Sequence, residues 1–322
     1  MTLGVFGVVG ALALGGPWAV AAEPVVICRP TFTISALAYI AEEQKFFTEE
    51  GLAVSFIEAT HGKICQDVLI AGRADFAFVF DGPFGYLGFQ DHPLRVLAEV
   101  GRDSSVALVA RRDRGITTVS DLKGKRIGYT PGTAGQFFLD EVLEQQGLTS
   151  RDVTRVTLQL PSLPPALVGG QVDAAVLIEP RGDQAMRALG ANGLRLRPPE
   201  IAAHPFLVIT SDEVLKAHPE RARQVLRALL RAETYAQNHV EDVQTLVAKK
   251  VSVDLPLIQR DWPPLDHAVR LDLALLGFLN RNAQWIVSED PSFTNRSLPN
   301  YRTFFAPEAL RDVAPERVGL GL

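Results

Sequence analysis

The sequence contains little of what several functional classes require. It has two cysteines and six histidines in 322 residues, aromatic residues make up only 8%, and no long run of lysine or arginine occurs. The formal net charge is −5, and acidic and basic residues are interspersed. Since nucleic-acid binding requires a basic surface, this composition argues against a nucleic-acid partner. The cysteines and histidines are too few and too irregularly spaced to predict a metal site.

The compact catalytic signatures are absent as well. The chain has no phosphate-loop lysine motif, no Gly-x-Ser-x-Gly elbow, no His-Glu-x-x-His pair and no kinase signature. We therefore expect no catalytic residues and no cofactor, which favours a binding protein over an enzyme. An enzyme whose catalytic groups are scattered along the chain stays open as an alternative.

The N-terminal segment differs in character from the rest of the chain. Residues 1–22 contain no charged side chain, and an apolar run over 3–14 is broken by Gly15, Gly16 and Pro17. Small residues precede Glu23, as at a signal-peptidase site, although the usual basic region is missing. The apolar run is shorter than the roughly 18 residues of a membrane span. We expect a signal peptide over 1–22 and a mature protein in the periplasm.

Strand patterns alternate with helical patterns along the mature chain. Strands are predicted at 24–28, 54–58, 75–80, 94–100, 106–110, 126–129, 153–160, 173–178 and 205–210. Helical spacing occupies most intervals between them and dominates from residue 218 onward. This alternation predicts an α/β protein with parallel or mixed sheets and helices on both faces. The length suits two domains, and the pattern restarts after Asp121.

The most informative segment spans residues 121–136. Arg126–Tyr129 reads as a strand, residues 130–133 (Thr-Pro-Gly-Thr) as a glycine-containing loop, and the next residues as a helix that ends at Gly147. Such a loop leaves backbone N–H groups of the first helical turn pointing at whatever lies above them. This arrangement suits a ligand with a carboxylate or sulfonate head, but an ordinary βα turn has the same pattern.

Two further patterns indicate a family. Leu69-Ile-Ala-Gly-Arg-Ala-Asp-Phe76 parallels Leu167-Val-Gly-Gly-Gln-Val-Asp-Ala174, and the strand after the second copy ends in Glu179-Pro180. Together with Asp121-Leu-Lys-Gly-Lys-Arg-Ile-Gly128 and the loop at 130–133, they resemble the periplasmic solute-binding proteins of ABC importers. The closest branch is the nitrate/sulfonate/taurine and thiamine-pyrimidine-precursor (NMT1/THI5-like) group. The resemblance covers roughly residues 24–290.

The resemblance implies a type II periplasmic-binding-protein fold with two lobes, each a mixed sheet flanked by helices. Lobe 1 would comprise 23–110 and 200–322, and lobe 2 would comprise 111–199. Hinge segments would lie near 108–114 and 196–204. The lobes would close on one small-molecule ligand, and an ABC permease in the inner membrane would receive it from a monomer.

The resemblance leaves ligand and role open. Small sulfonates, nitrate, pyrimidines and aromatic acids are all candidates, and aromatic side chains near the predicted strand ends favour an anionic or zwitterionic organic ligand. An enzyme on the same fold, similar to the pyrimidine synthases, is one alternative. A ligand-sensing module that docks a membrane receptor is another.

The predicted strand ends supply candidate ligand-binding residues, because ligands of open α/β sheets lie beyond the carboxyl ends of strands. In lobe 1 these are Arg29, Thr31, Phe32, Thr60, His61, Asp81, Gly82, Pro83 and Phe84. In lobe 2 they are Thr130, Gly132, Thr133, Gly135, Gln136 and Glu179. Arginine pairs with carboxylate or sulfonate through two hydrogen bonds, so Arg29 and Arg181 are candidate anion partners. Arg181 fits a surface position equally well.

The two cysteines form a separate question. Cys28 and Cys65 each fall just past a different predicted strand of lobe 1. Export to an oxidising compartment makes a disulfide between them the leading interpretation. Two alternatives stay open: a pair of buried free thiols, and a soft-metal or thiol-reactive ligand site that includes His61.

Overall fold

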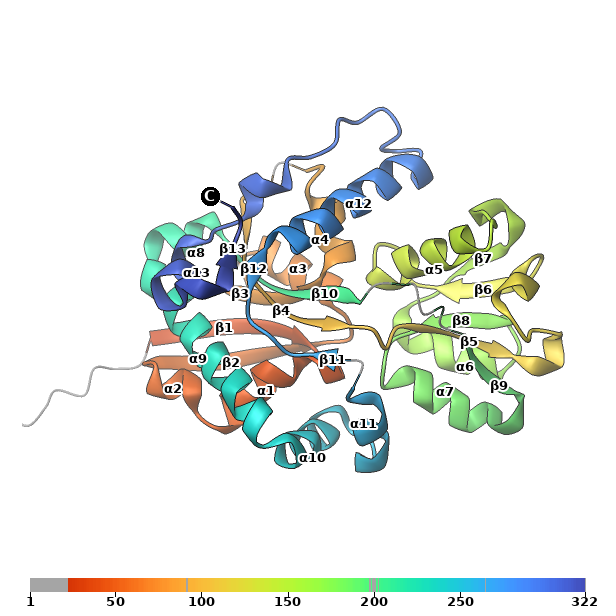
Figure 1. The fold of residues 1–322 in the computed structure, drawn as a ribbon, viewed down its shortest axis with the longest axis horizontal. Coiled ribbons are helices and arrows are strands. Elements are labelled where there is room, and N and C mark those ends of the chain that lie inside the picture. The colour runs from red at the N-terminus through yellow and green to blue at the C-terminus, as the bar shows by residue number, and fades with distance from the viewer. Residues whose placement is uncertain are drawn as a thin grey trace, which may run out of the picture.

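The structure, a computed structural model, describes residues 23–90, 92–196, 198, 201, 203–263 and 265–321. The predicted signal peptide lies outside the described residues. The described chain forms two α/β lobes side by side, each built on its own sheet (Figure 1). Among the described residues, no helix combines the length and the apolar character needed to cross a lipid bilayer.

The first lobe contains a six-stranded mixed sheet in the order β11-β4-β10-β3-β1-β2. Its strands are β1 (Glu23–Pro30), β2 (Leu52–Ala59), β3 (Phe76–Phe80), β4 (Leu94–Asp103), β10 (His204–Ser211) and β11 (Leu265–Asp266). β1 runs parallel to β2 and β3, whereas β10 is antiparallel to β3 and β4. All five residues of β3 are buried, which explains its unbroken apolar sequence.

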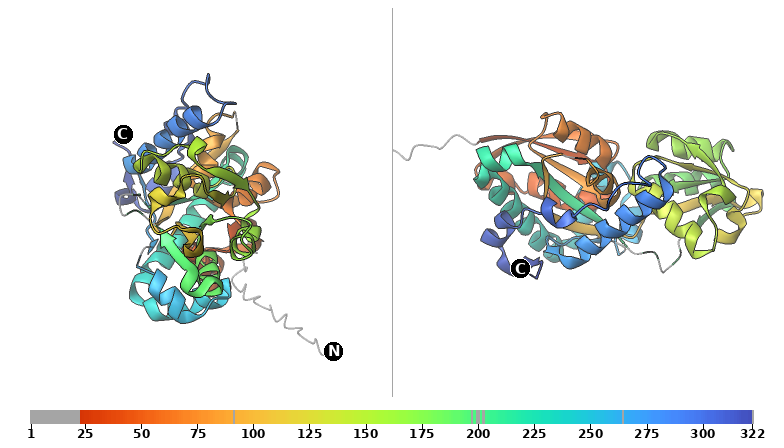
Figure 2. Two further views of the ribbon diagram at one scale, coloured as in Figure 1. Left: turned by 90° about the vertical axis from the view of Figure 1, so that its right-hand side faces the viewer. Right: turned by 90° about the horizontal axis from the view of Figure 1, so that it is seen from above.

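Helices cover both faces of this sheet (Figures 1 and 2). The helices of this lobe are α1 (Ala36–Glu43), α2 (Phe46–Glu49), α3 (Gly62–Ile70), α4 (Asp81–Leu87), α8 (Asp212–Ala217), α9 (Pro219–Asn238), α10 (Val240–Val251), α11 (Leu255–Asp261), α12 (Leu273–Glu289) and α13 (Glu308–Val313). A two-stranded pair, β12 (Leu271–Asp272) and β13 (Val318–Gly319), lies beside α12. Short 3₁₀ turns occupy Thr33–Ser35, Tyr301–Phe304 and Pro315–Arg317.

The second lobe contains a five-stranded mixed sheet in the order β7-β6-β8-β5-β9. Its strands are β5 (Ala107–Arg111), β6 (Arg126–Tyr129), β7 (Thr154–Thr157), β8 (Ala174–Leu177) and β9 (Gly193–Leu196). Its helices are α5 (Ala134–Gln145), α6 (Leu163–Val168) and α7 (Arg181–Leu189). Short 3₁₀ turns occupy Arg112–Arg114, Val119–Leu122, Ser150–Asp152, Leu160–Ser162 and Gly190–Asn192. The two mixed sheets with flanking helices agree with the predicted fold class.

Two connections join the sheets in the described part of the chain, from β4 to β5 and from β9 to β10. The first lies between Asp103 and Ala107, a few residues before the segment predicted at 108–114, because β5 pairs with β8 and β9. The second falls within the segment predicted at 196–204. Paired connections of this kind are the geometry of a hinge.

One local prediction differs from the structure, and one helix was not anticipated. The strand predicted at 153–160 ends at Thr157, because Pro161 lies in the first turn of a short 3₁₀ helix that begins at Leu160. Residues 81–87 form α4 although they include two glycines and a proline, which lower helix propensity. Gly85 lies there because a Cβ would come within 3.1 Å of Asn282 Cβ on α12, so packing overrides helix propensity.

Candidate functional site

The carboxyl ends of six strands, three from each lobe, meet around one small cavity between the lobes. The ends of β1, β2 and β3 bring lining residues of the first lobe, and the ends of β6, β7 and β8 bring those of the second. The lining is Phe32, His61, Gly62, Lys63, Phe80, Pro83, Thr133, Ala134, Leu160 and Ile178. The cavity measures about 10 Å³, so the lobes are closed on each other here.

Helix α3 begins at this cavity. Its N-cap residue, His61, has an extended backbone and its side chain caps no backbone N–H group. The first N–H groups of an α-helix have no partner inside the helix, and they carry a partial positive charge. Gly62 allows the helix to begin this close to the sheet, because a Cβ there would lie 2.9 Å from the Cα of Val79.

His61 has a buried nitrogen without a partner. The residue is 8% exposed, and Nδ1 makes no hydrogen bond. Burial lowers the pKa of His61, and the nearby charges of Lys63 and Arg181 lower the pKa further, whereas Asp67 acts in the opposite direction. The ring is therefore neutral at neutral pH. A buried polar atom without a hydrogen bond is costly, so a ligand that supplied a partner would gain affinity.

Arg181 faces the same region from the second lobe. It is the first residue of α7, it is half-buried, and its buried Nη1 has no hydrogen-bond partner. Its guanidinium carbon lies 5.7 Å from the centroid of the Phe32 ring of the first lobe. Burial lowers the pKa of Arg181, but a guanidinium stays charged in proteins. Among the described residues no carboxylate forms an ion pair with it, so it is a partly buried cation without a counter-ion.

Lys63 also lines the cavity. Its Nζ lies 2.8 Å from Asp67 Oδ2, one turn along α3. Its stem lies along the loop before α5, because a Cβ on Gly132 would lie 3.7 Å from Lys63 Cδ and Cε. The lysine charge is thus largely compensated within α3.

Comparisons with known proteins fit this geometry. A family model described as NMT1/THI5 like matches residues 33–242. The chain belongs to the NMT1/THI5-like family. Among curated proteins, the 4-amino-5-hydroxymethyl-2-methylpyrimidine phosphate synthase of Aspergillus parasiticus is 25% identical over 299 residues, which cover 81% of this chain and 82% of that protein.

Two solved structures of similar fold are solute-binding proteins. The alkanesulfonate-binding protein SsuA from Xanthomonas axonopodis pv. citri, bound to MOPS, superimposes with a TM-score of 0.77 at 18% identity and covers 89% of this chain and 100% of that one. The periplasmic nitrate-binding protein NrtA from Synechocystis PCC 6803 superimposes with a TM-score of 0.74 at 13% identity and covers 91% and 89%. At these sequence identities the similarity confirms the fold, but it does not identify a ligand or a role.

In this NMT1/THI5-like chain, four of the predicted site residues line the cavity: Phe32, His61, Pro83 and Thr133. Leu160 and Ile178 also line it, although the sequence analysis does not include them. Ile178 stands directly before Glu179-Pro180, at the end of a buried strand. This position would have identified it as a candidate lining residue.

The loop before α5 satisfies several of its own polar groups. The Thr130 hydroxyl donates to the carbonyl of Leu158, and the Thr133 hydroxyl donates to the carbonyl of Thr130. The N–H of Gly132 donates to Gln136 Oε1. Gly135 packs inward, where a Cβ would lie 3.2 Å from Val176 Cγ1. These partners reduce the number of amides that the loop has for a ligand.

Arg29 does not reach the cavity, which corrects its predicted role as an anion partner. Its guanidinium bonds to Glu58 and Glu42 and lies 4.5 Å and 3.6 Å from the ring centroids of Tyr39 and Phe56. Successive side chains of a strand point to opposite faces. Cys28 therefore faces α3, and Arg29 faces the other side of the sheet.

Five other predicted residues do not line the cavity either, and two of them, Asp81 and Phe84, are directed elsewhere. Asp81 is fully buried, with Oδ2 accepting a hydrogen bond from Asn282 and Oδ1 3.4 Å from His204 Nδ1. Phe84 packs edge-on against Phe304 at a centroid distance of 5.9 Å. Two predicted threonines do not form part of the cavity lining: Thr60 is exposed, and the backbone N–H of Thr31 donates to the carbonyl of Ala59. Gly82 contacts the second lobe through its backbone.

Glu179 belongs to a charge cluster beneath α7. Its carboxylate lies 2.6 Å from Arg195 Nη1 and accepts the N–H of Asp183. Asp183 also pairs with Arg260 of α11, which reaches over from the first lobe. Glu179, Asp183 and Asp261 lie close enough to hold a metal ion, but each of the three already forms an ion pair with Arg195 or Arg260. The cluster is therefore an ion-pair network between the lobes.

The disulfide predicted between Cys28 and Cys65 is confirmed. It links β1 to α3, and both residues are fully buried. Since the two sulfur atoms are bonded to each other, they serve neither as free thiols nor as metal ligands. The bond fixes α3 four residues after His61 and thereby supports the wall of the cavity.

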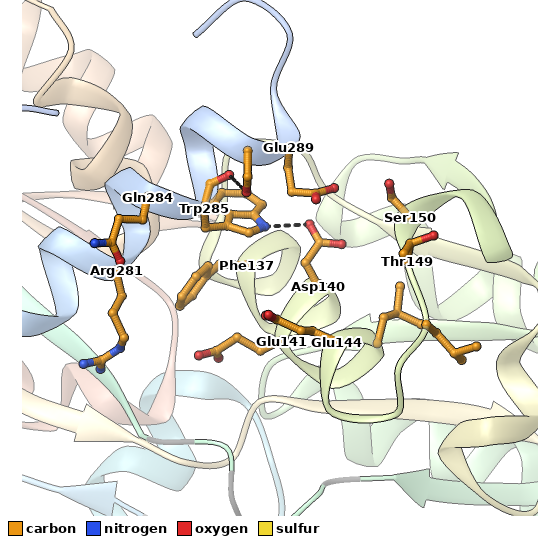
Figure 3. Close-up of a pocket in the computed structure, with 13 residues that line it drawn as sticks. Phe137, Asp140, Glu141, Glu144, Thr149, Ser150, Arg281, Gln284, Trp285 and Glu289 are labelled. Carbon is orange, nitrogen blue, oxygen red and sulfur yellow. Dashed lines mark hydrogen bonds between the residues drawn. The ribbon is translucent and has the colours of Figure 1, made fainter. Parts of the chain in front are cut away.

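A larger hollow of about 600 Å³ lies between α5 of the second lobe and α12 of the first (Figure 3). Trp285 Nε1 donates to Asp140 Oδ2 across it, at 3.0 Å. Its lining includes Glu141, Glu144 and Glu289, and the latter two are exposed. His61, whose buried Nδ1 has no partner, lines the small cavity instead, and Arg181 lies beside Phe32 of the same lining. We therefore assign the candidate ligand site to the small cavity despite its size.

Proposed function

We propose that this protein is the extracytoplasmic solute-binding component of an ABC importer. It captures a small organic ligand, anionic or zwitterionic, between the lobes and delivers it to an inner-membrane permease. It acts in the periplasm as a monomer after removal of residues 1–22. The class of ligand includes sulfonates, pyrimidines and aromatic acids.

One observation carries the proposal: each lobe places a buried polar atom without a partner beside the contact between the lobes. His61 Nδ1 belongs to the first lobe and Arg181 Nη1 to the second. A core that served only stability would pair such atoms or replace them with apolar groups. A ligand between them would satisfy both atoms at once, and only while the lobes are closed. Binding and closure are thereby coupled.

The two connections between the sheets make such closure feasible. β4 leads into β5, and β9 leads into β10, so the lobes are able to rotate about a pair of adjacent segments. Closure excludes water and adds contacts from the second lobe, which increases affinity for the enclosed ligand.

Native mass spectrometry of protein purified without refolding tests the proposal. We expect one small molecule per chain, released by denaturation. Small-angle X-ray scattering before and after removal of that molecule should show a larger radius of gyration for the ligand-free protein. A protein that carries no small molecule, and whose scattering stays constant across a panel of sulfonates, pyrimidines and aromatic acids, would refute it.

An enzyme on the same fold is the second candidate, because the curated relative from Aspergillus parasiticus is named as a pyrimidine phosphate synthase. The two functions differ in what happens to the ligand. A binding protein returns the bound molecule chemically unchanged, whereas an enzyme returns a product. The mass of the molecule recovered after overnight incubation with the purified protein separates the two.

A further inference from the structure

We propose that Arg260 and Asp261, at the end of α11 in the first lobe, form an electrostatic latch on α7 of the second lobe in which the two charges act in opposite directions. Arg260 favours closure of the lobes, and Asp261 opposes it, so that the ligand-free protein does not lock closed. The inference rests on the proposed solute-binding function, because that function needs lobes that open and close. It goes further by assigning the side chains that set the balance between the two forms.

The latch lies at a contact between the lobes that charged side chains make. In Figure 1, α11 lies below the strands and next to α7, whereas the contact between α12 and α5 lies above them. Arg260 Nη2 donates a hydrogen bond to Asp183 Oδ1 of α7 and so joins the two lobes. The same guanidinium donates to both carboxylate oxygens of Asp261, at 2.9 Å each. Arg260 therefore brings Asp261 with it to the second lobe.

The cluster on the second lobe carries a net negative charge at this contact. Asp183 and Glu179 are each 3% exposed, and Arg195 of β9 pairs with both, at 2.7 Å and 2.6 Å. Two carboxylates and one guanidinium leave one negative charge that is not balanced within this cluster. Because the carboxylates are buried, a cation from the first lobe is attracted to them and an anion is repelled.

Arg260 and Asp261 therefore contribute to closure with opposite signs. One carboxylate oxygen from each of Glu179, Asp183 and Asp261 lies within 4.8 Å of the other two. Burial is the largest cause of the raised pKa of Glu179 and of Asp183, and the like charge of Asp261 contributes to both. Separation of the lobes relieves this repulsion but breaks the contact between Arg260 and Asp183. The closed cluster, with three carboxylates and two guanidiniums, keeps one negative charge in excess.

Apolar packing across this contact is loose. A hollow of about 80 Å³ lies between α7 and the segment that joins α10 to α11, and Asp183 lines it. A second ion pair crosses the lobes here, from Arg187 to Asp254 at 3.0 Å, but these side chains are 53% and 72% exposed, so water screens them. The buried carboxylates beside Arg260 therefore dominate the electrostatic balance of the contact.

Opposed charges leave the choice between the open and closed forms to the ligand. With Arg260 alone, the attraction would favour a closed and empty protein, and a ligand would then bind only to the fraction that opens. With Asp261 beside Arg260, the attraction is offset by repulsion. The contacts that an enclosed ligand makes with both lobes are then sufficient to shift the equilibrium toward closure.

The variants Arg260→Gln and Asp261→Asn test the latch in the mature protein after removal of any carried molecule, so no ligand has to be identified. A nitroxide is attached at Arg151→Cys, an exposed site next to Ser150, which lines the hollow facing α12. Closure brings this label near α12, so paramagnetic relaxation of first-lobe amides reports the closed-to-open ratio even when the closed form is minor. The measurement is made at pH 8, above the raised pKa of Glu179 of about 7, so that this carboxylate is ionised.

We expect Asp261→Asn to raise the closed-to-open ratio by about three- to tenfold and Arg260→Gln to lower it by a similar factor. The double variant should return close to the wild-type ratio, because it lacks both contributions. Salt at about 0.5 M should reduce the effect of each single variant by screening. Arg187→Gln, from the exposed pair on α7, is the matched control and should change the ratio by less than about twofold.

Three results would overturn the latch while leaving the solute-binding function standing, because in each of them the lobes still move. Asp261→Asn could leave the ratio unchanged or lower it, which would show that Asp261 does not oppose closure. Arg260→Gln could leave the ratio unchanged or raise it, which would remove the attractive contact. An effect of Arg187→Gln as large as that of Arg260→Gln would assign the contact to the exposed pair. Absence of a closed form in every variant, including wild type with its carried molecule, would overturn both the latch and the closure that the proposed function needs.

Discussion

Gly82 and Ala134 are in backbone contact across the two lobes: a Cβ on Gly82 would lie only 2.8 Å from the amide nitrogen of Ala134. Gly82 is in the first turn of α4, and Ala134 is the first residue of α5. The closed arrangement therefore requires a glycine at position 82. Any side chain there acts as a wedge between the lobes.

We predict that Gly82→Ala favours the open form without unfolding either lobe. The contact belongs to two lobes that are able to separate, so separation relieves the clash. The radius of gyration from scattering with saturating ligand should stay near the ligand-free value, and ligand affinity should fall by about 10-fold or more. The melting temperature of the ligand-free protein should stay within about 2 °C.

Gly88→Ala is the contrasting control. A Cβ there would lie 2.4 Å from Tyr301 Cε1, and both residues belong to the first lobe. This clash has no lobe motion to relieve it, so the melting temperature should fall by several degrees, roughly as for about 1–3 kcal/mol of overpacking. If Gly82→Ala lowered the melting temperature as much as Gly88→Ala, the contact would not act as a lobe wedge.

A second prediction concerns pH and Glu179. Burial raises the pKa of this carboxyl from 4.5 to about 7, partly offset by Arg195. Between these two pH values the folded state binds more protons at Glu179 than the unfolded state does. The free energy of unfolding should therefore decrease as pH rises from about 4.5 to 7, by about 3 kcal/mol at most from this group.

Glu179→Gln removes this titration, so its stability should depend less on pH over the same window. Urea denaturation at half-unit pH steps provides the measurement. Glu289→Gln, which alters an exposed carboxylate, is the control and should keep the wild-type slope. A wild-type protein that gains stability relative to Glu179→Gln as pH rises would contradict the assigned direction of the pKa shift.

A third prediction concerns the disulfide, which closes a sequence separation of 37 residues. In the chain-entropy treatment, loss of a cross-link of this length costs about 4 kcal/mol. Replacement of Cys28 and Cys65 together by alanine should lower the urea midpoint accordingly. Ligand affinity should also fall, because the bond anchors α3 close to His61.

Thiol titration complements that measurement. The wild-type protein, denatured without reductant, should show no free thiol, and two after reduction. Dithiothreitol should destabilise the wild type and leave the double alanine variant unchanged. Two titratable thiols in unreduced protein exported to the periplasm would refute the disulfide.

The alternation of strands and helices allowed the fold to be predicted, because buried strands such as β3 and β8 consist of continuous apolar residues. The family motifs added the two lobes. α4 was not predictable in this way, since its sequence contains Gly82, Pro83 and Gly85. The two glycines are required by contacts with α5 and α12, which are distant in the sequence.

The site was predictable to the level of strand ends but not of side-chain direction. Arg29 and Arg181 both follow or end a strand, and either suits an anion. Only the packing distinguishes them: Arg29 meets Glu42 and Glu58, whereas Arg181 meets no carboxylate among the described residues. Successive side chains of β1 point to opposite faces of the sheet, so the position of Arg29 along the strand places it on the face where Glu42 and Glu58 lie. Its partners come from neighbouring elements, which the sequence alone does not identify.

A fourth prediction follows from that difference. Arg29→Met should lower the free energy of unfolding by about 2 kcal/mol, which is less than for a fully buried ion pair because Glu42 and Glu58 are 35% and 47% exposed and regain water. Affinity for an anionic probe should change by less than about twofold. Urea denaturation and calorimetry on the same preparation separate the two effects, and a large loss of affinity in a stable Arg29→Met protein would return Arg29 to the site.

The last prediction couples ligand binding to protons at His61. The groups that face this ring are Lys63 and Asp67 on α3 and Arg181 on α7, and the ring pKa in the ligand-free cleft lies below 6.5. A bound anion offsets the two cations and so raises the pKa of His61. The complex then binds more protons than the free protein, and affinity for an anionic probe should increase as pH falls below about 6.5.

Calorimetry in two buffers of different ionisation enthalpy measures the effect directly. At pH 6 the wild type should take up a fraction of a proton per molecule of benzoate or benzenesulfonate bound, and both acids are fully ionised there. His61→Gln keeps a hydrogen-bonding side chain but no titratable group, so its proton uptake should vanish and its affinity should be flat between pH 5.5 and 8. His239→Gln, on an exposed helix end of the first lobe, should behave as the wild type. Proton release on binding, or uptake that persists in His61→Gln, would show that the anion does not sit beside this ring.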